Sequence, residues 1–179
     1  QRMAVMTLTR STIGKKVIMA VTGVIWVGFL AFHMYGNLKI FQGAAYFNEY
    51  SEGLRHIGEP IFGAHHLLWV ARLVLLGAVV LHVWAAIDLT RAARRARPDS
   101  YAVRKRVQAD YASVTMRYGG AAIFFFLLYH LAHFTWGVRA VHPDFIPGDA
   151  YHNLVVGFQN PVNVILYLVA LVAVGLHLY

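Results

Sequence analysis

Four histidines lie inside apolar stretches long enough to cross a membrane: His33, His82, His130 and His177. A polar ring in hydrocarbon is costly unless a neighbouring group compensates it. Four such rings at related depths on four helices therefore indicate a shared partner. Neutral imidazoles that face one another across a helix bundle commonly hold haem iron from both sides. The pattern predicts a membrane cytochrome b.

The composition indicates a membrane protein, because 59% of the 179 residues are hydrophobic and 13% are charged. Soluble domains are about 45–50% apolar and about 25% charged. The formal net charge of +8 comes from basic residues beside the apolar spans, so it favours membrane orientation over nucleic-acid binding. The absence of cysteine excludes disulfides, thiolate-held iron–sulfur clusters and cysteine nucleophiles.

We expect an all-α fold in which a transmembrane helix bundle forms a single domain over residues 1–179. Each span approaches the ~20 residues that cross a ~30 Å hydrocarbon core. The four expected spans are residues 17–38, 62–89, 114–138 and 161–179. The basic segment before residue 17 is similar to the start of a signal peptide. The apolar run behind it is too long for one and no small-residue cleavage site follows, which favours a retained helix.

The connections between the spans differ in character. Residues 42–60 mix acids, aromatic residues and glycine, which predicts a short amphipathic helix at the membrane interface. Pro98 breaks the second connection, and residues 99–112 resume a basic, helix-compatible pattern. Residues 142–160 hold two prolines and Gly148, so we expect a loop there.

Lysine and arginine counts near the span ends predict the orientation. The N-terminal flank and the second connection are basic, whereas acids outnumber lysine and arginine in the first and third connections. We therefore expect a multi-pass protein of the plasma (inner) membrane, with its N-terminus and second connection in the cytoplasm. The basic residues of the second connection are Arg91, Arg94, Arg95, Arg97, Arg104, Lys105 and Arg106.

The helical rise of about 1.5 Å per residue assigns a depth to each histidine. His33 and His130 fall in the outer half of the membrane, and His82 and His177 fall in the inner half. Two ring pairs at two depths suit two haems stacked across the bilayer. Depth alone leaves His130 and His133 as alternatives, because both lie on one helix face and His133 matches His33 slightly better.

A haem held by two axial imidazoles has no open iron position for oxygen or substrate, so it relays single electrons. Stacked haems would carry electrons between the two membrane faces. Any one intramembrane histidine can equally be bonded to a neighbouring helix. The other histidines, interpreted as solvated or propionate-bonding, are His56, His65, His66, His142 and His152. Glycines that either admit the macrocycle or pack helices together are Gly23, Gly28, Gly36, Gly77, Gly119, Gly120 and Gly175.

Other protein classes also use intramembrane histidines. A di-iron desaturase or hydroxylase needs dense motifs such as HxxxH and HxxHH, whereas the tight pairs here are His65 with His66 and His130 with His133, without carboxylate neighbours. A haem-free anchor or metal transporter is a second alternative, which a reduced-minus-oxidised spectrum separates from a cytochrome. Cytochrome b subunits of formate dehydrogenase or nitrate reductase also hold two haems and are the nearest mechanistic rivals.

Four segments of the sequence carry a resemblance to a known family. They are STIGKKVIMAVTGVIWVGFLAFHMYGNL (residues 11–38), VVLHVW around His82, MRYGGAAIFFFLLYHLAHFTWG (116–137) and GLHLY (175–179). These segments resemble the single-chain, two-haem cytochrome b that anchors succinate dehydrogenase and fumarate reductase in the membrane. The resemblance covers essentially the whole chain. Its first and third segments are the most specific, whereas the histidine of the second segment is supported mainly by its position.

That resemblance implies a haem for each pair of histidines. In the family, the histidine of the first helix and one in the third segment hold the distal haem, near the outer face, and the other two hold the proximal haem. The Tyr129–His130 step favours His130 over His133. The matching positions are His33 and His130 for the distal haem, and His82 and His177 for the proximal haem.

The resemblance also implies a task. In the family, a flavoprotein subunit oxidises succinate in the cytoplasm, an iron–sulfur subunit passes the electrons on, and the membrane subunit anchors both and reduces a quinone, here expected to be menaquinone. The chain would be part of an enzyme without carrying the succinate site. The cytoplasmic arginines are then either docking contacts or only topology determinants. The family carries a further span after its fourth histidine, so we expect a fifth helix to be missing after Tyr179.

Quinone reduction takes two electrons and two protons, so its site needs a nearby haem and a titratable path to water. In the family an acidic residue of the outer interfacial segment is linked to quinone proton exchange. The candidates are Glu52, His56 and Glu59 on the outer side, and Arg10, Ser11, Lys15 and Asp88 on the inner side. Each of them can equally be an ordinary interface residue.

Overall fold

The computed structural model describes residues 9–96 and 111–179, and this part of the chain is helical without strands. Its helices long and apolar enough to span a membrane are Thr12–Gln42, His66–Arg95, Met116–Thr135 and Pro161–Leu178. The predicted all-α transmembrane class is therefore confirmed. The predicted break at Pro98 and most of the basic stretch 99–112 lie outside the described residues, as do Arg97, Arg104, Lys105 and Arg106.

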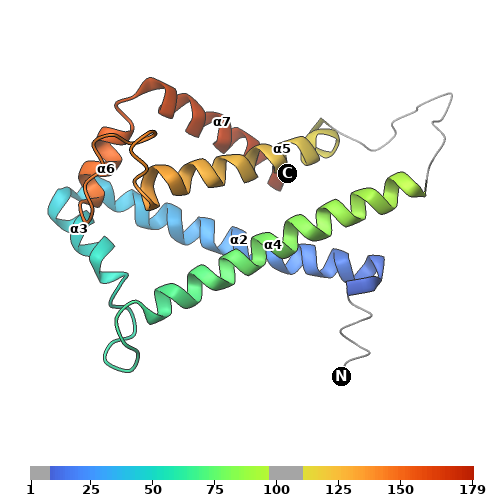
Figure 1. The fold of residues 1–179 in the computed structure, drawn as a ribbon, viewed down its shortest axis with the longest axis horizontal. Helices are drawn as coiled ribbons and strands as arrows, with labels where there is room; N and C mark the ends of the chain where they lie inside the picture. Colours follow the sequence, from blue (N-terminus) through green and yellow to red (C-terminus); the bar gives the residue numbers. More distant parts are fainter. Residues whose placement is uncertain (1–8, 97–110) are drawn as a thin grey trace. The chain divides into compact units, whose positions relative to one another are not determined.

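The chain divides into two compact units, Gln1–Phe41 with Glu52–Ala102 and Gln42–Ser51 with Val103–Tyr179. In the first unit, α2 (Thr12–Leu38) packs against α4 (His66–Arg95) (Figure 1). The contact surface is built of small buried residues, Thr22 on α2 and Ala78 and Ala85 on α4. Small side chains let two membrane helices approach closely.

Three boundaries of the first unit differ from the sequence prediction, one of them the end of α4, which lies at Arg95 rather than at residue 89. Helix α2 begins at Thr12 rather than at residue 17, because the Ser11 side chain accepts a hydrogen bond from the Gly14 backbone N–H at 3.0 Å. A serine at this position satisfies an otherwise unpaired donor of the first turn. Helix α4 begins at His66 rather than at residue 62, because the chain still forms turns up to His65.

In the second unit, α5 (Tyr111–His130) packs against α7 (Pro161–Leu178) (Figure 1). Helix α7 begins with Asn160 as its cap, whose side chain accepts from the Val162 N–H at 2.9 Å, and with a proline in its first turn, where no N–H is needed. Beyond His130 the helix widens into a π-helical turn, Leu131–Thr135. Such turns often occur at functional sites.

Two short helices lie in the predicted connections. The amphipathic helix expected within residues 42–60 is α3 (Ala44–Gly53), followed by turns. The loop expected over residues 142–160 is wrong in its second half, because α6 (Ala150–Gly157) forms there. Asp149 caps α6 by accepting from the His152 N–H at 2.9 Å. The two prolines and Gly148 all precede this helix, so they do not interrupt its apolar residues.

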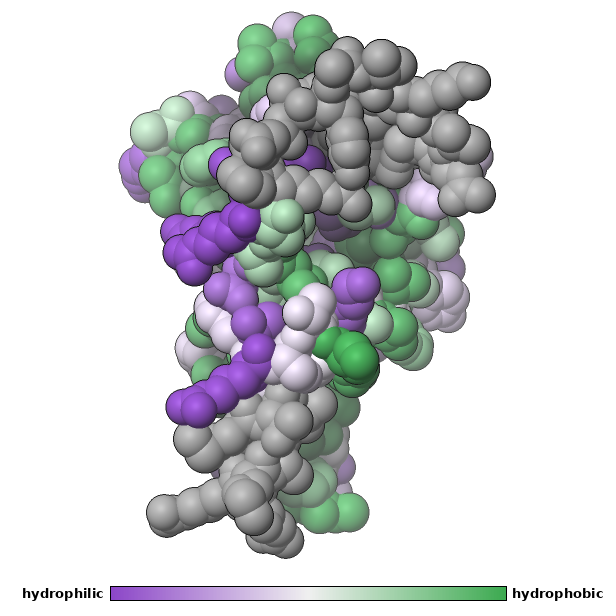
Figure 2. Space-filling model, turned by 90° about the vertical axis from the view of Figure 1, so that its right-hand side faces the viewer, coloured by the Kyte–Doolittle hydropathy of each residue, from purple (hydrophilic) through white to green (hydrophobic). Residues whose placement is uncertain are grey.

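Large apolar side chains point outward along the membrane-length helices. Exposed examples are Phe32, Leu73, Phe125, Ile165 and Leu171. Figure 2 shows hydrophobic residues over much of the visible surface, beside a smaller number of long hydrophilic side chains. Apolar side chains that face outward along a helix of this length are expected to contact lipid.

Candidate functional site

The His82 ring lies on the face of α4 that packs against α2. It is four residues after Ala78 and three before Ala85, both of which are buried. Its Nδ1 lies 3.2 Å from the Met19 carbonyl oxygen and 3.1 Å from the Thr22 hydroxyl. The hydroxyl itself donates to the Ile18 carbonyl at 2.7 Å. A carbonyl oxygen can only accept, so the His82 proton is assigned to Nδ1 and a neutral ring then has its lone pair on Nε2.

Two of the predicted ligands lie over glycines of a neighbouring helix. A Cβ atom on Gly23 of α2 would lie 3.7 Å from Cε1 of His82. A Cβ atom on Gly120 of α5 would lie only 3.2 Å from Cε1 of His177. These glycines therefore leave room for imidazole rings. A Cβ atom on Gly119, by contrast, would lie 3.9 Å from the Ala173 backbone oxygen, which is an ordinary packing distance between the two helices.

His177 lies on the face of α7 that packs against α5. Asn163 and Ala170 are both buried on this face, and His177 follows Ala170 by seven residues, as Ala170 follows Asn163. Residues seven apart share a helix face. His33 is half-buried on α2, where its ring stacks on Phe29 with centroids 5.3 Å apart and planes inclined by 19°.

His130 and His133 have different surroundings. Nδ1 of each ring lies 3.1 Å from the Tyr167 hydroxyl. Nε2 of His133 also lies 3.3 Å from the Asn163 side-chain nitrogen, and the whole His133 ring is buried. Both nitrogens of His133 are therefore held by protein groups, which is the arrangement of a structural histidine. His130 shares the Tyr167 contact through Nδ1 and is only half-buried, so its role as a ligand stays a prediction from the sequence.

His142 was expected to be solvated or propionate-bonding, but it is buried with only 2% of its surface exposed. Its Nδ1 lies 3.1 Å from the His133 carbonyl oxygen, to which it donates. The π-helical turn diverts the following N–H groups to Leu131 and Ala132, so the imidazole takes the place of a backbone donor. His142 thus caps the end of the third membrane helix.

The donor chemistry of these histidines fits haem iron. The contact of His82 Nδ1 with the Met19 carbonyl orients this ring, and Gly23 and Gly120 provide space beside two of the rings. Each predicted pair takes one ring from each unit, His33 with His130 and His82 with His177. The pairing therefore stays a prediction from the sequence. Within the described residues, no group of three or more His, Cys, Asp or Glu forms a separate metal cluster.

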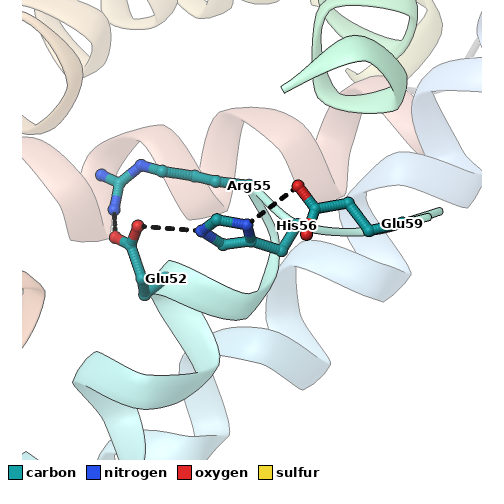
Figure 3. A network of polar contacts seen from close by, with 4 residues as sticks. All are labelled: Glu52, Arg55, His56 and Glu59. Atoms are coloured by element: carbon teal, nitrogen blue, oxygen red, sulfur yellow. Dashed lines mark hydrogen bonds and ion pairs between the residues drawn. The ribbon is translucent and has the colours of Figure 1, made fainter. Parts of the chain in front are cut away.

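The outer quinone candidates form one polar network, which Figure 3 shows. Glu52 forms an ion pair with Arg55, and its other oxygen lies 3.4 Å from Nε2 of His56. Nδ1 of His56 lies 3.2 Å from Glu59. The hydrogen bond and charge of Glu59 raise the pKa of His56 above its usual value. Desolvation would raise the pKa of Glu52, but hydrogen bonds and charges from Arg55 and His56 lower it overall.

The inner quinone candidates are tied to the start of α2. Ser11 caps the helix, and Lys15 forms an ion pair with Asp88 of α4. This ion pair joins the two helices one to two turns from Met19, which holds His82. Arg10 lies exposed immediately before the cap. The structure thus brings Lys15 and Asp88 together. The other two candidates on this side, Arg10 and Ser11, are near Lys15 in the sequence.

Sequence reasoning missed the residues that hold the rings. Thr22 and Met19 support His82, and Asn163 and Tyr167 surround His133 and His130. A signal for the second pair was present, because Asn163 and Tyr167 lie four residues apart on an otherwise apolar helix. Polar groups in a membrane helix are expected to face protein rather than lipid.

Comparison with known proteins identifies the family of the chain. Residues 90–179, half of the chain, match the model of the succinate dehydrogenase/fumarate reductase transmembrane subunit family. The matched region includes His130 and His177. No curated protein and no solved structure matches the chain. With its membrane-length helices and this match, the chain belongs to the succinate dehydrogenase/fumarate reductase transmembrane subunit family.

Proposed function

We propose that the chain is the membrane anchor and electron-transfer subunit of a succinate:quinone oxidoreductase, and that it holds two haem b groups. His33 and His130 are the axial ligands of the outer haem, and His82 and His177 are those of the inner haem. When bound, the group supplies a one-electron redox centre whose two axial positions are filled by protein. The protein itself holds the rings, fixes their tautomers and keeps the site among apolar helices.

The hydrogen bond from His82 to the Met19 carbonyl carries this proposal. A histidine that binds a metal donates one N–H to an acceptor, which orients the ring and raises the basicity of the other nitrogen. Met19 and Thr22 hold His82 in this way.

Orientation and partners follow from charge. We place the N-terminus and the end of α4 in the cytoplasm, because Arg91, Arg94 and Arg95 lie exposed there. This basic end faces the iron–sulfur subunit, which in turn carries the flavoprotein subunit with the succinate site. His82 and His177 would hold the haem nearer this end and His33 and His130 the other, and each would supply a one-electron centre at its own depth.

The acceptor in this proposal is a membrane quinone, with menaquinone as the expected substrate. A quinone that accepts two electrons also needs two protons from water. The network of Glu52, His56 and Glu59 offers one route at the outer interface, because a single imidazole lies within reach of two carboxylates. The Lys15–Asp88 ion pair with Ser11 marks the alternative position at the inner end.

The test is haem counting in the complex purified with its soluble subunits. His33→Ala, His82→Ala, His130→Ala and His177→Ala are each expected to lose at least one haem per chain. His133→Ala and the exposed His66→Ala are expected to retain both. If His133→Ala loses a haem while His130→Ala keeps two, the assignment of the outer ligand is wrong.

A further inference from the structure

The groups around His130, among which His133 and Asn163 are buried, form a continuous chain of hydrogen bonds that begins at Asn163. The side-chain nitrogen of Asn163 lies 2.7 Å from the Gly157 carbonyl oxygen, which can only accept. The Tyr129 hydroxyl donates to the Asn163 oxygen at 2.6 Å. The Gly157 contact alone fixes the orientation of the amide and the Tyr129 contact agrees with it, so the second N–H points to Nε2 of His133 at 3.3 Å.

The orientation of Asn163 in turn fixes the tautomer of His133. Nε2 of His133 must accept, because a proton there would face the amide N–H of Asn163 donor to donor. The single proton of the neutral ring therefore lies on Nδ1, which donates to the Tyr167 oxygen at 3.1 Å. One lone pair of the Tyr167 hydroxyl is thereby used.

Whether the Tyr167 hydroxyl donates to His130 or accepts from it determines which nitrogen of His130 carries the proton. Nδ1 of His130 lies 3.1 Å from the same hydroxyl. If Tyr167 donates to Nδ1 of His130, the proton of the neutral His130 ring must lie on Nε2, where it would block binding of a metal. If Tyr167 accepts a second time, the His130 proton lies on Nδ1 and Nε2 has a lone pair for iron.

We propose that Asn163 and Tyr167 are positioning residues for His130, and that they act on the outer haem through the tautomer of His133. This inference depends on the proposed function, in which His130 is an axial ligand. Because His133 already donates to Tyr167, the oxygen is a weakened acceptor for His130 Nδ1–H. A weaker acceptor leaves the ligand less basic, which favours reduced iron and raises the potential of this haem.

The two positions therefore affect the haem in opposite directions. Tyr167→Phe removes the acceptor, so the ligand becomes less basic and the potential rises. Asn163→Leu removes the donor that fixes His133. The His133 proton can then move to Nε2, Tyr167 donates to Nδ1 of His133, and both oxygen lone pairs become available to His130. The ligand becomes more basic and the potential falls.

The experiment is a spectroscopic redox titration of both haems in the purified complex. We expect Tyr167→Phe to shift the oxidised/reduced equilibrium of the outer haem about tenfold toward the reduced form, equivalent to about 59 mV for one electron. Asn163→Leu is expected to shift it in the opposite direction. Tyr129→Phe is the matched control, because it removes a hydroxyl bonded to the Asn163 oxygen and leaves both amide hydrogens in place.

The outer haem is identified as the one lost in His130→Ala. Unchanged potentials in Tyr167→Phe, or shifts of the same sign in Tyr167→Phe and Asn163→Leu, overturn this inference while leaving the two-haem function intact. If Asn163→Leu does not assemble, the shift in Tyr167→Phe against that in Tyr129→Phe decides. A wild-type complex without haem overturns both the inference and the proposed function.

Discussion

Replacing Gly120 by alanine tests whether His177 lies where a ligand must lie. The new Cβ atom would be 3.2 Å from Cε1 of the imidazole. Two carbon atoms pack best at about 3.5–4.0 Å, so the ring must retreat by roughly 0.3–0.8 Å. Functional groups generally need to be held within about 0.5 Å of their working geometry. The expected displacement is therefore large enough to disturb binding of iron.

We expect Gly120→Ala to weaken binding of the inner haem at least tenfold, in line with the roughly 10- to 100-fold losses seen when a ligand's support is changed. Gly119→Ala is the matched control, because its Cβ meets only the Ala173 oxygen at an ordinary 3.9 Å. Both changes alter helix propensity equally. Haem content per chain is measured as the purified complex is washed with detergent. Equal retention in the two variants would show that His177 is not placed as a ligand.

Three further predictions concern other parts of the chain. Thr22→Val removes one of the two acceptors of His82 Nδ1–H, so we expect a higher potential for the inner haem in a redox titration. Thr22→Ser keeps the hydroxyl and should match the wild type. Equal potentials in all three proteins would contradict the role of Thr22. The pKa of His56 lies above its usual value because Glu59 holds its charged form, so stabilisation by this pair is complete below about pH 6.5 and is lost as pH rises through the raised pKa. An NMR titration should show the His56 pKa falling in Glu59→Gln, and an unchanged value would refute the contact. Asn153→Leu leaves the Ile146 N–H and carbonyl without their side-chain partner, at a cost of roughly 1–3 kcal/mol. Hydrogen exchange at the Ile146 amide should therefore accelerate about tenfold. Asn160→Leu, at another helix, is the control.

The membrane helices could be predicted well from the sequence because hydropathy acts over twenty residues and tolerates local exceptions. The start of α2 was misplaced, since Lys15 and Lys16 were interpreted as a polar flank although the Ser11 cap carries the helix through them. Helix α6 was missed because two prolines and a glycine dominated the interpretation of a segment whose last third is apolar. The π-helical turn at Leu131–Thr135 has no local signature in the sequence.

The candidate ligands could be chosen from the sequence, but their supports could not. Depth along a helix makes His82 a candidate, whereas the acceptor for its Nδ1 is the carbonyl of Met19, sixty-three positions earlier in the chain. A backbone carbonyl carries no residue-specific signal. The distinction between His130 and His133 likewise depended on a resemblance, because the contacts of Asn163 with His133 appear only when α5 and α7 are packed together.

The central claim is tested most directly by the haem content and ligation of the purified complex. A reduced-minus-oxidised spectrum with a haem assay should give two b haems per chain, and magnetic circular dichroism of the oxidised protein should show both irons with two imidazole ligands. A complex that contains no haem, a single haem, or an iron with a ligand other than a second imidazole would contradict the account.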